Sequence, residues 1–257
     1  MNRLSVCIIT LNEEHNLPRA LASLKAIADE IVVVDSGSTD RTAEIAREHG
    51  ARWFERAWSN YADQKNYAAQ CASHDWVLSM DADEDLSSRL QTSLLSWKKH
   101  TPEHCVYEVS RKTFYLGAWI EHSGWYPDFQ RRLYRRDEAE FSGIVHESLR
   151  HAGTIGRLSG DLLHYTVRSF EEHEANVERY TTLAAQQMFA EGKRNWKGAM
   201  WCAAPWSWFQ SFVLRGGFMD GYRGALIAKM AARSVRLKYA KLGKLVQTTR
   251  RSDKAAS

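Results

Sequence analysis

The chain has few cysteines and no segment typical of secretion or of a membrane span. Its 257 residues include four cysteines with no CxxC spacing, so a zinc site is not indicated. The N-terminus lacks the basic and then apolar pattern of a signal sequence. The nearly apolar stretch 199–214 is shorter than the ~18 residues expected of a spanning helix. We therefore expect a reduced, cytoplasmic protein with free thiols.

Two further absences narrow the function class. No glycine-rich loop follows the first apolar run, which disfavours P-loop and dinucleotide-binding enzymes. No recognisable nucleic-acid-binding motif is present, so we expect no nucleic-acid partner. The length allows one large domain with an appendage.

An acidic triplet, Asp81-Ala82-Asp83, follows directly after the apolar run Trp76–Met80. An apolar run of that length predicts a buried parallel strand. Open α/β sheets bind ligands at the carboxyl ends of their strands, and carboxylate oxygens there suit Mg²⁺ or Mn²⁺ held against substrate phosphates. Short acidic clusters more often cap helices or lie in solvated loops, so the triplet needs support from the rest of the chain.

The same strand-then-polar-loop architecture occurs twice upstream. Strands are predicted at Leu4–Thr10 and Glu30–Val34. Helices are predicted after the N-cap Asn16, at 41–49 and at 60–71. Strands that alternate with helices through short links predict an α/β fold with a mostly parallel sheet, flanked by helices.

In such a sheet the polar segments after the three strands meet at one edge. Three ordinary strand-to-helix loops would explain the serines and glycine at 36–38, but not the carboxylates that gather at this edge. The convergence predicts a nucleotide site.

At this point the chain resembles glycosyltransferase family 2, which has the Rossmann-like GT-A fold. Within that family it is most similar to the lipopolysaccharide inner-core β-1,4-glucosyltransferases. The resemblance covers residues 4 to about 221 and rests on the segments Thr10–Glu13, Val34–Asp40, Gln64–Asn66, Asp81–Glu84, Gly124–Asp128, Arg131–Arg136, Val145–Glu147 and Arg215–Gly221.

The resemblance implies a UDP-sugar donor and assigns residues to it. Asp35 resembles the residue that reads the uracil ring, and Lys65 a basic residue near the nucleotide. Asp81 is similar to the residue that holds the ribose. The residues expected to frame the nucleotide are Thr10, Asn12 and Glu13.

The resemblance also implies a divalent cation, Mg²⁺ or Mn²⁺, that bridges the two phosphates. Asp83 resembles its carboxylate ligand, and His146 resembles the additional ligand that several family members supply from a later loop. A lone histidine is more often an ordinary core or surface residue, but the Val-His-Glu context favours the metal. Such a cation neutralises a diphosphate leaving group without proton transfer.

The catalytic base is expected to be a carboxylate, because inverting transfer requires deprotonation of the acceptor hydroxyl. Many family members place this base in a Glu-Asp pair on the acceptor side, and no such pair occurs here after Glu84-Asp85. The candidates are Asp128, in a loop with Trp, Tyr and Pro, and Glu147, beside the expected metal ligand. We favour Asp128.

The region from Lys193 to the end is strongly basic. It has 14 Lys/Arg and two acids, a balance of +12, whereas the rest of the chain carries −8. It also contains Trp201, Trp206 and Trp208 in an apolar stretch interrupted by Pro205, and basic residues alternate with apolar ones over 225–245. Such segments can lie on anionic membranes. The alternative is that the tryptophans pack onto the catalytic domain and the charges form a solvated face.

The sequence thus predicts a catalytic domain over 1–192 and a helical, basic, membrane-associating region over 193–257. The expected protein is an inverting glycosyltransferase at the cytoplasmic membrane's inner face. Its expected acceptor is a lipid-linked oligosaccharide, the heptose of the lipopolysaccharide core, and its expected sugar is glucose. The alternatives are a nucleotidyltransferase on a similar sheet and a non-catalytic membrane-binding module.

Overall fold

The computed structural model describes residues 1–143, 147–167 and 169–255. The chain forms two compact units. The first comprises Met1–Lys112 and Asp128–Tyr165, and the second comprises Thr113–Pro127 and Thr166–Ser257. The boundary proposed from the sequence, between residues 192 and 193, lies inside the second unit.

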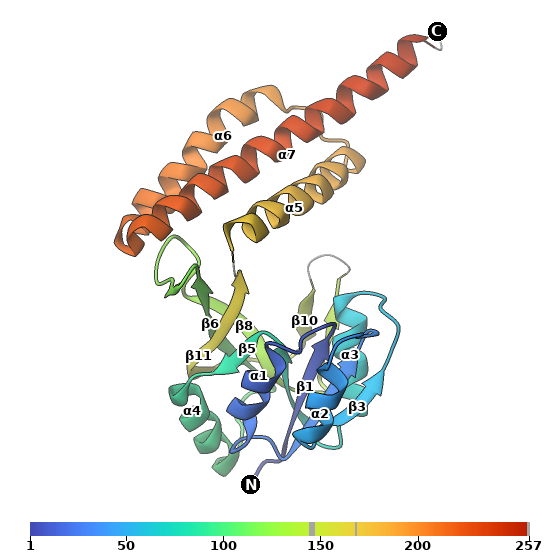
Figure 1. Ribbon diagram of the computed structural model, residues 1–257, viewed down its shortest axis with the longest axis vertical. Helices are drawn as coiled ribbons and strands as arrows, with labels where there is room; N and C mark the ends of the chain where they lie inside the picture. The colour runs from blue at the N-terminus through green and yellow to red at the C-terminus, as the bar shows by residue number, and fades with distance from the viewer. Residues whose placement is uncertain (144–146, 168, 256–257) are drawn as a thin grey trace. The chain divides into compact units, whose positions relative to one another are not determined.

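The first unit contains four parallel strands in the order β3-β2-β1-β4 (Figure 1). The elements of this part are β1 Leu4–Thr10, α1 Leu17–Leu24, β2 Glu30–Asp35, α2 Thr42–Glu48, β3 Arg52–Glu55, α3 Tyr61–Cys71 and β4 Trp76–Asp81. The strands and helices predicted from the sequence are therefore confirmed, and β3 is an addition.

Both faces of these strands are covered, which explains why they are continuous apolar runs. In β1, Val6 and Ile8 face the cluster that includes residues of α1, α2 and α4, whereas Cys7 faces the cluster that includes α3. Leu17, Leu21 and Leu24 are the buried leucines of α1. Successive side chains of the strand therefore point into two different hydrophobic clusters, one on each face of the sheet, and neither face is exposed to solvent.

The sheet continues on the other side of β4 with antiparallel strands. Its full order is β3-β2-β1-β4-β8-β6-β11-β5, with β7 paired to β6, and a separate hairpin joins β9 and β10. These elements, which the sequence did not predict, are β5 Glu84–Leu86, α4 Ser88–Lys99, β6 Val106–Tyr115, β7 Ala118–Trp119, β8 Asp128–Arg135, β9 Ala139–Ser142, β10 Ser148–His151 and β11 Ile155–Val167.

The helix ends follow local chemistry with one small shift. Helix α2 begins at Thr42 rather than Arg41, and a carboxylate oxygen of Asp40 accepts the backbone N–H of Thr42 at 3.0 Å. Gly50 follows the helix with φ +73°, the left-handed conformation that glycine adopts freely. Asn60 caps α3 by accepting the N–H of Asp63.

Glu30 links the ends of three strands. Its carboxylate accepts hydrogen bonds from the Ser5 hydroxyl at 2.5 Å and from the Ser73 N–H at 2.7 Å, and it pairs with Arg52. Burial by itself raises the pKa of Glu30, but these hydrogen bonds outweigh burial and lower it to about 2. The folded protein therefore holds the ionised form more strongly than the unfolded chain does.

Replacing Glu30 by glutamine is expected to lower the free energy of unfolding at neutral pH by about 3 kcal/mol, since one pKa unit corresponds to about 1.4 kcal/mol. The folded pKa lies below the unfolded value of 4.5, so this contribution is complete above 4.5 and is lost as the pH falls toward 2. Urea unfolding of both proteins from about pH 7 to pH 3 measures the difference. Glu138→Gln, at a surface pair with Arg135, is the control and should change little. A pH-independent difference would contradict the expectation.

The second unit is mainly helical. Its elements include α5 Phe170–Ala190, α6 Lys197–Phe209, the π-helical segment η1 Gln210–Leu214, the 3₁₀ segment η2 Gly217–Asp220 and α7 Gly221–Ala255. Helix α7 packs against both α5 and α6 (Figure 1). Pro205 lies within α6 and does not end the helix.

Several apolar residues of α7 are buried inside this unit. Leu226, Met230 and Leu242 are at most 8% exposed, and Leu242 joins a cluster with Ala185 of α5. The face of α7 that the sequence assigned to a membrane surface therefore packs against neighbouring helices. Within the described residues, no helix has the length and apolar character that crossing a membrane would require.

Candidate active site

The polar ends of β1, β2 and β4 lie side by side at one edge of the sheet. The register pairs Thr10 of β1 with Asp35 of β2, and Ile9 of β1 with Asp81 of β4. Asp35 and Asp81 therefore flank the end of β1, two strand spacings or roughly 9–10 Å apart. Two carboxylates that are distant in sequence thus belong to one edge of the sheet.

Asp35 is nearly fully buried and organises the loop that follows it. Its carboxylate accepts the Thr10 hydroxyl at 2.9 Å and the backbone N–H groups of Gly37 and Ser38 at 2.8 and 2.6 Å. Gly37 has φ +102°, which a side chain at that position would strain. Thr10 and Asp35, both predicted to contact the nucleotide, are therefore in direct contact.

The loop after β1 is tied to the loop after β2. Asn12 adopts φ +57°, and its side-chain oxygen accepts the N–H of Thr39 at 2.9 Å. The N–H of Glu13 donates to the Thr42 hydroxyl at 2.8 Å, while the Glu13 carboxylate accepts from the amide of Asn16. Asn12 and Glu13 thus hold the two loops together at the edge of the predicted nucleotide site.

Each side chain of the α3 triplet 64–66 reaches a different part of the unit. Gln64 donates to the Ser36 hydroxyl at 2.9 Å, and Asn66 exchanges two hydrogen bonds with the backbone of Phe141. Lys65 is 4% exposed and lies between two carboxylates, 3.2 Å from Asp81 and 3.1 Å from Glu147. Helix α3 therefore connects the strand edge to the segment that precedes β10.

Asp81 lies between two cations. Arg132 Nη2 is 2.8 Å from Oδ2 of Asp81 and 2.7 Å from Oε1 of the fully buried Glu84, and Lys65 contacts the other oxygen of Asp81. Burial by itself raises the pKa of Asp81, but the guanidinium of Arg132 and the ammonium of Lys65 outweigh it and hold the pKa well below its usual range. Asp81 is therefore a fixed, ionised acceptor.

Asp83 is separate from this network. Its Oδ2 lies 3.3 Å from Nε2 of His164, a residue of β11, and the Asp83 carbonyl accepts the N–H of Tyr165. Carboxylate and imidazole groups are both possible ligands of a divalent cation, and here they are in contact. No group of three or more candidate metal ligands occurs in the described residues. His146, the predicted second ligand, lies outside those residues.

The two candidate bases are both held by cations. Arg111 donates to Oδ2 of Asp128 from Nε and Nη2, at 2.9 and 2.7 Å, and Gln130 donates to the other oxygen at 2.8 Å. Glu147 pairs with Lys65. Glu147 contacts Lys65 directly, whereas Asp128 is linked to the Lys65–Asp81 network through Arg111, whose Nη1 lies 4.0 Å from Oε1 of Glu84.

A pocket of about 320 Å³ adjoins these residues. It is lined by Lys65, Asp81, Arg111, Phe129, Gln130, Arg131, Arg132, Phe141, Glu147, Ser148 and Leu149. The lining contains four cations and two carboxylates, an arrangement that favours an anionic ligand. The pocket thus contains three of the residues predicted from the sequence, and two partners of Asp128 line it as well.

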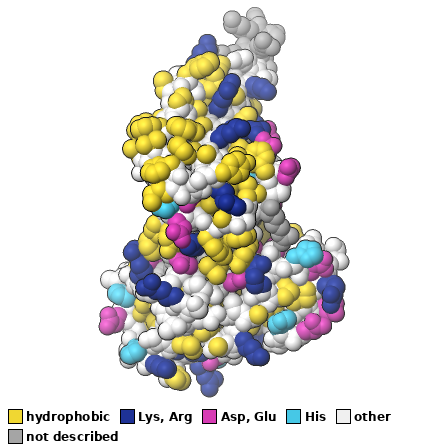
Figure 2. All heavy atoms as spheres, turned by 60° about the vertical axis from the view of Figure 1, so that its left-hand side comes forward, with side chains coloured by type: hydrophobic (Ala, Val, Ile, Leu, Met, Phe, Trp, Pro, Cys, Tyr) yellow, Lys and Arg dark blue, Asp and Glu magenta, His cyan; other side chains and the backbone are white. Residues whose placement is uncertain are grey.

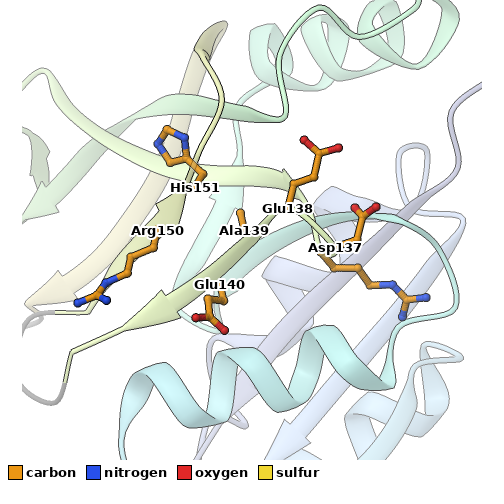
Figure 3. Close-up of a pocket in the computed structure, with 7 residues that line it drawn as sticks. Asp137, Glu138, Ala139, Glu140, Arg150 and His151 are labelled. Atoms are coloured by element: carbon orange, nitrogen blue, oxygen red, sulfur yellow. The ribbon is translucent and has the colours of Figure 1, made fainter.

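A second pocket, of about 390 Å³, lies at the β9–β10 hairpin (Figure 3). Its lining residues are Arg136, Asp137, Glu138, Ala139, Glu140, Arg150 and His151. Acidic and basic side chains are evenly mixed there, and no residue predicted from the sequence lines it. We therefore place the active site at the strand edge and not at this hairpin.

Three contacts of the site were missed from the sequence: Arg132 with Asp81, His164 with Asp83 and Arg111 with Asp128. Arg132 lies in the segment that contributed to the family resemblance, but its buried pairing depends on the antiparallel pairing of β8 with β4. His164 lies in a strand of mixed polarity without any ligand-like spacing.

Comparisons with known proteins show which proteins this chain is similar to. The Glycosyl transferase family 2 model matches residues 5–150. An uncharacterized glycosyltransferase of Rickettsia typhi is 30% identical over 95% of this chain and 88% of its own length. The lipopolysaccharide core biosynthesis glycosyltransferase LpsC of Rhizobium meliloti is 31% identical over 92% of this chain and 93% of its own.

Two solved structures show more distant similarity. Staphylococcus aureus TarS 1–349 has a TM-score of 0.48 and 16% identity, and the match covers 99% of this chain and 92% of that chain. Glucosyl-3-phosphoglycerate synthase from Mycobacterium tuberculosis, in complex with Mn²⁺, UDP and glucosyl-3-phosphoglycerate, has a TM-score of 0.36 and 24% identity over 44% of each chain.

Proposed function

This chain belongs to glycosyltransferase family 2, and from that premise we propose that it transfers a sugar, with glucose as the expected one, from a UDP-sugar to a heptose of the lipopolysaccharide inner core. The enzyme class follows from the family. The donor, the acceptor and the cation are the proposed part. The observation that carries the proposal is the position of three carboxylates at the ends of neighbouring strands. Asp35 is the last residue of β2, Asp81 is the last residue of β4, and Asp83 follows two residues later.

The donor site is proposed along this edge. Asp35, held by Thr10 and two backbone N–H groups, would accept from the uracil ring, and Asp81 would accept from the ribose. The other residues proposed to line the donor site are Asn12, Glu13 and Lys65. Because Lys65 and Arg132 keep Asp81 ionised and in place, the ribose would meet an acceptor that needs no rearrangement.

Asp83 is the residue proposed to hold Mg²⁺ or Mn²⁺, together with His146 as the sequence predicts. His164 is a further candidate, because its Nε2 is beside Asp83 and no described group hydrogen-bonds to its buried Nδ1. When bound, the cation neutralises negative charge on the diphosphate leaving group without proton transfer.

Asp128 is proposed as the base, with Glu147 as the alternative. Asp128 is held in one orientation by Arg111 and Gln130 and remains 35% exposed, so an acceptor hydroxyl can reach it. Glu147 lines the pocket but already balances the buried charge of Lys65. Asp128 is also the more exposed of the two carboxylates, 35% against 24%.

The acceptor is proposed from the likeness to LpsC, whose name specifies lipopolysaccharide core biosynthesis. A lipid-linked acceptor would be presented at a membrane, so we include peripheral attachment to the inner face of the cytoplasmic membrane in the proposal. The strong positive balance of the region from Lys193 onward supports attachment to an anionic surface.

A donor screen tests this function directly. The protein is incubated with UDP-glucose, UDP-galactose or UDP-N-acetylglucosamine, with and without Mn²⁺. Hydrolysis of the UDP-sugar and the rise in the melting temperature of the protein are both measured. Transfer is then assayed on a heptose-terminated lipopolysaccharide core. Release of UDP together with a glycosylated acceptor supports the proposal. Release of pyrophosphate from a nucleoside triphosphate, with no sugar transfer, would favour the nucleotidyltransferase alternative.

A further inference from the structure

Helix α6 and the segment after it expose an unusual number of large apolar side chains. Trp201 is 72% exposed, Trp206 55% and Leu214 59%. Figure 2 shows hydrophobic side chains gathered over the helical part of the molecule. We call this surface the apolar face and define it by Trp201, Trp206, Trp208, Phe209, Leu214 and Phe218.

Four of the five aromatic residues of the apolar face lie close to another aromatic ring. The rings of Trp206 and Phe209 lie 5.9 Å apart, and those of Trp208 and Phe212 lie 5.0 Å apart. Phe212 in turn contacts Phe218 of η2, at 6.4 Å between ring centroids. Exposed aromatic residues that cluster in this way mark a binding surface, whereas single exposed apolar residues do not.

Helix α6 leaves its large aromatic residues exposed and buries a small one, Ala204. It packs against α7, and its buried positions Ala204 and Ser211, the second in η1, are 7% and 6% exposed. A surface helix of a soluble protein usually does the opposite and buries its large apolar residues. Full burial of one such side chain contributes about 1.5–3 kcal/mol. A partner that covers these exposed side chains would therefore gain binding free energy from their burial.

The charges around the apolar face distinguish between partners. Between Gly192 and Met219 the chain has four Lys/Arg and no Asp/Glu. Lys197 and Arg215, at the two ends of the α6–η1 segment, are both exposed. A symmetric pairing of two copies through this face would bring the same cations together without any acid to balance them. An anionic lipid surface complements them.

The length of the segment fits a position in the plane of the membrane. Helix α6 has 13 residues, fewer than the ~20 that a spanning helix requires. Tryptophan prefers the level of the lipid headgroups, where its ring is in an apolar layer and its N–H remains near water. The three exposed tryptophans of α6 thus match the interface better than the hydrocarbon core.

We propose that the apolar face inserts into the headgroup region of an anionic bilayer, with α6 lying parallel to the surface. This deepens the membrane attachment contained in the proposed function. It assigns the contact to α6, η1 and η2, and not to the basic α7, in which Leu226, Met230 and Leu242 are buried. Attachment then has an apolar component that persists at high salt, in addition to a salt-sensitive electrostatic one.

Vesicle co-sedimentation tests the assignment, with vesicles of phosphatidylglycerol and phosphatidylcholine and with phosphatidylcholine alone. The wild-type protein is expected to bind the anionic vesicles and to keep part of that binding at high salt. The double variant Trp201→Gln/Trp206→Gln is expected to bind at least about tenfold more weakly, including at high salt, because each lost ring removes apolar burial. Lys197→Glu is expected to weaken binding mainly at low salt.

Trp58→Gln is the matched control, since Trp58 is 48% exposed but belongs to the first unit. It should bind vesicles like the wild type. Circular dichroism and melting confirm that the variants fold, and Mn²⁺-dependent UDP-sugar hydrolysis should be unchanged in all of them. If the wild-type protein does not hydrolyse any UDP-sugar, the proposed function is contradicted, but the membrane assignment is not affected.

Two results would overturn the membrane assignment. One is equal vesicle binding by the wild type and the double variant. The other is absence of wild-type binding combined with a dimer, seen by analytical ultracentrifugation, that the double variant abolishes. In that case the apolar face is a contact between copies of the chain.

Discussion

Replacing Asp83 by alanine is expected to abolish Mn²⁺-dependent binding of UDP and to leave the fold intact. Asp83 follows the end of β4, is 24% exposed on its side chain, and contacts His164 rather than the buried Lys65–Asp81–Arg132 network. Its removal therefore takes away a proposed metal ligand without leaving a buried cation unpaired. Isothermal titration of Mn²⁺ and UDP measures the loss, which should be about 100-fold or more, since even residues that only orient a ligand contribute 10–100-fold.

Asp137→Ala is the control for Asp83→Ala. Asp137 is 57% exposed and pairs only with Arg135 at the surface, so UDP binding should not change. His164→Ala tests the neighbouring imidazole separately and should weaken Mn²⁺ binding if His164 is a ligand. Unchanged metal dependence in Asp83→Ala, with a normal melting temperature, would remove Asp83 from the cation site.

Replacing Asp128 by asparagine is expected to lower the transfer rate by about 10²–10⁴-fold, the usual contribution of a general base. The amide keeps the shape of the carboxylate, and its oxygen can still accept from Arg111, but it cannot take up the proton of the acceptor hydroxyl. Binding of UDP and Mn²⁺ should be unchanged, because Asp128 makes no contact with Asp35, Asp81 or Asp83 among the contacts described above. Initial rates of sugar transfer, together with donor titration, measure both quantities.

Glu147→Gln is tested in parallel, because Glu147 is the alternative base. Its replacement removes the ion pair with Lys65 while the pair between Lys65 and Asp81 remains. We expect weaker donor binding rather than loss of proton transfer. If Asp128→Asn transfers sugar at nearly the wild-type rate and Glu147→Gln does not, the assignment of the base has to be reversed.

Much of the donor side could be predicted from short segments of sequence. The runs Leu4–Thr10 and Trp76–Asp81 form the expected strands, and the register places Asp35 and Asp81 on either side of β1. These strands could be predicted because a buried parallel strand is a short, continuous apolar run. The common edge could be predicted because parallel strands end at the same edge of a sheet. The assignment of donor, metal and base roles to these residues stays a prediction.

The antiparallel half of the sheet could not be predicted in the same way. Its strands, β8 and β11 for example, are rich in arginine or mixed in polarity and lack a clear period. Their place in the sheet depends on pairing with strands far away in the sequence. Arg132 and Asp81 are 51 residues apart, and only the pairing of β8 with β4 brings the two together.

The sequence by itself determined the family, the α/β order of the first elements and the carboxylates at the strand ends, because each depends on a local pattern or a contiguous motif. The tertiary structure alone decided which charges neutralise one another and which apolar residues remain outside. Helix α6 is apolar on all sides, so its sequence cannot show that Ala204 faces α7 while Trp201 and Trp206 face outward. The burial of the apolar side of α7 likewise depended on α5, a helix that lies more than thirty residues earlier in the chain.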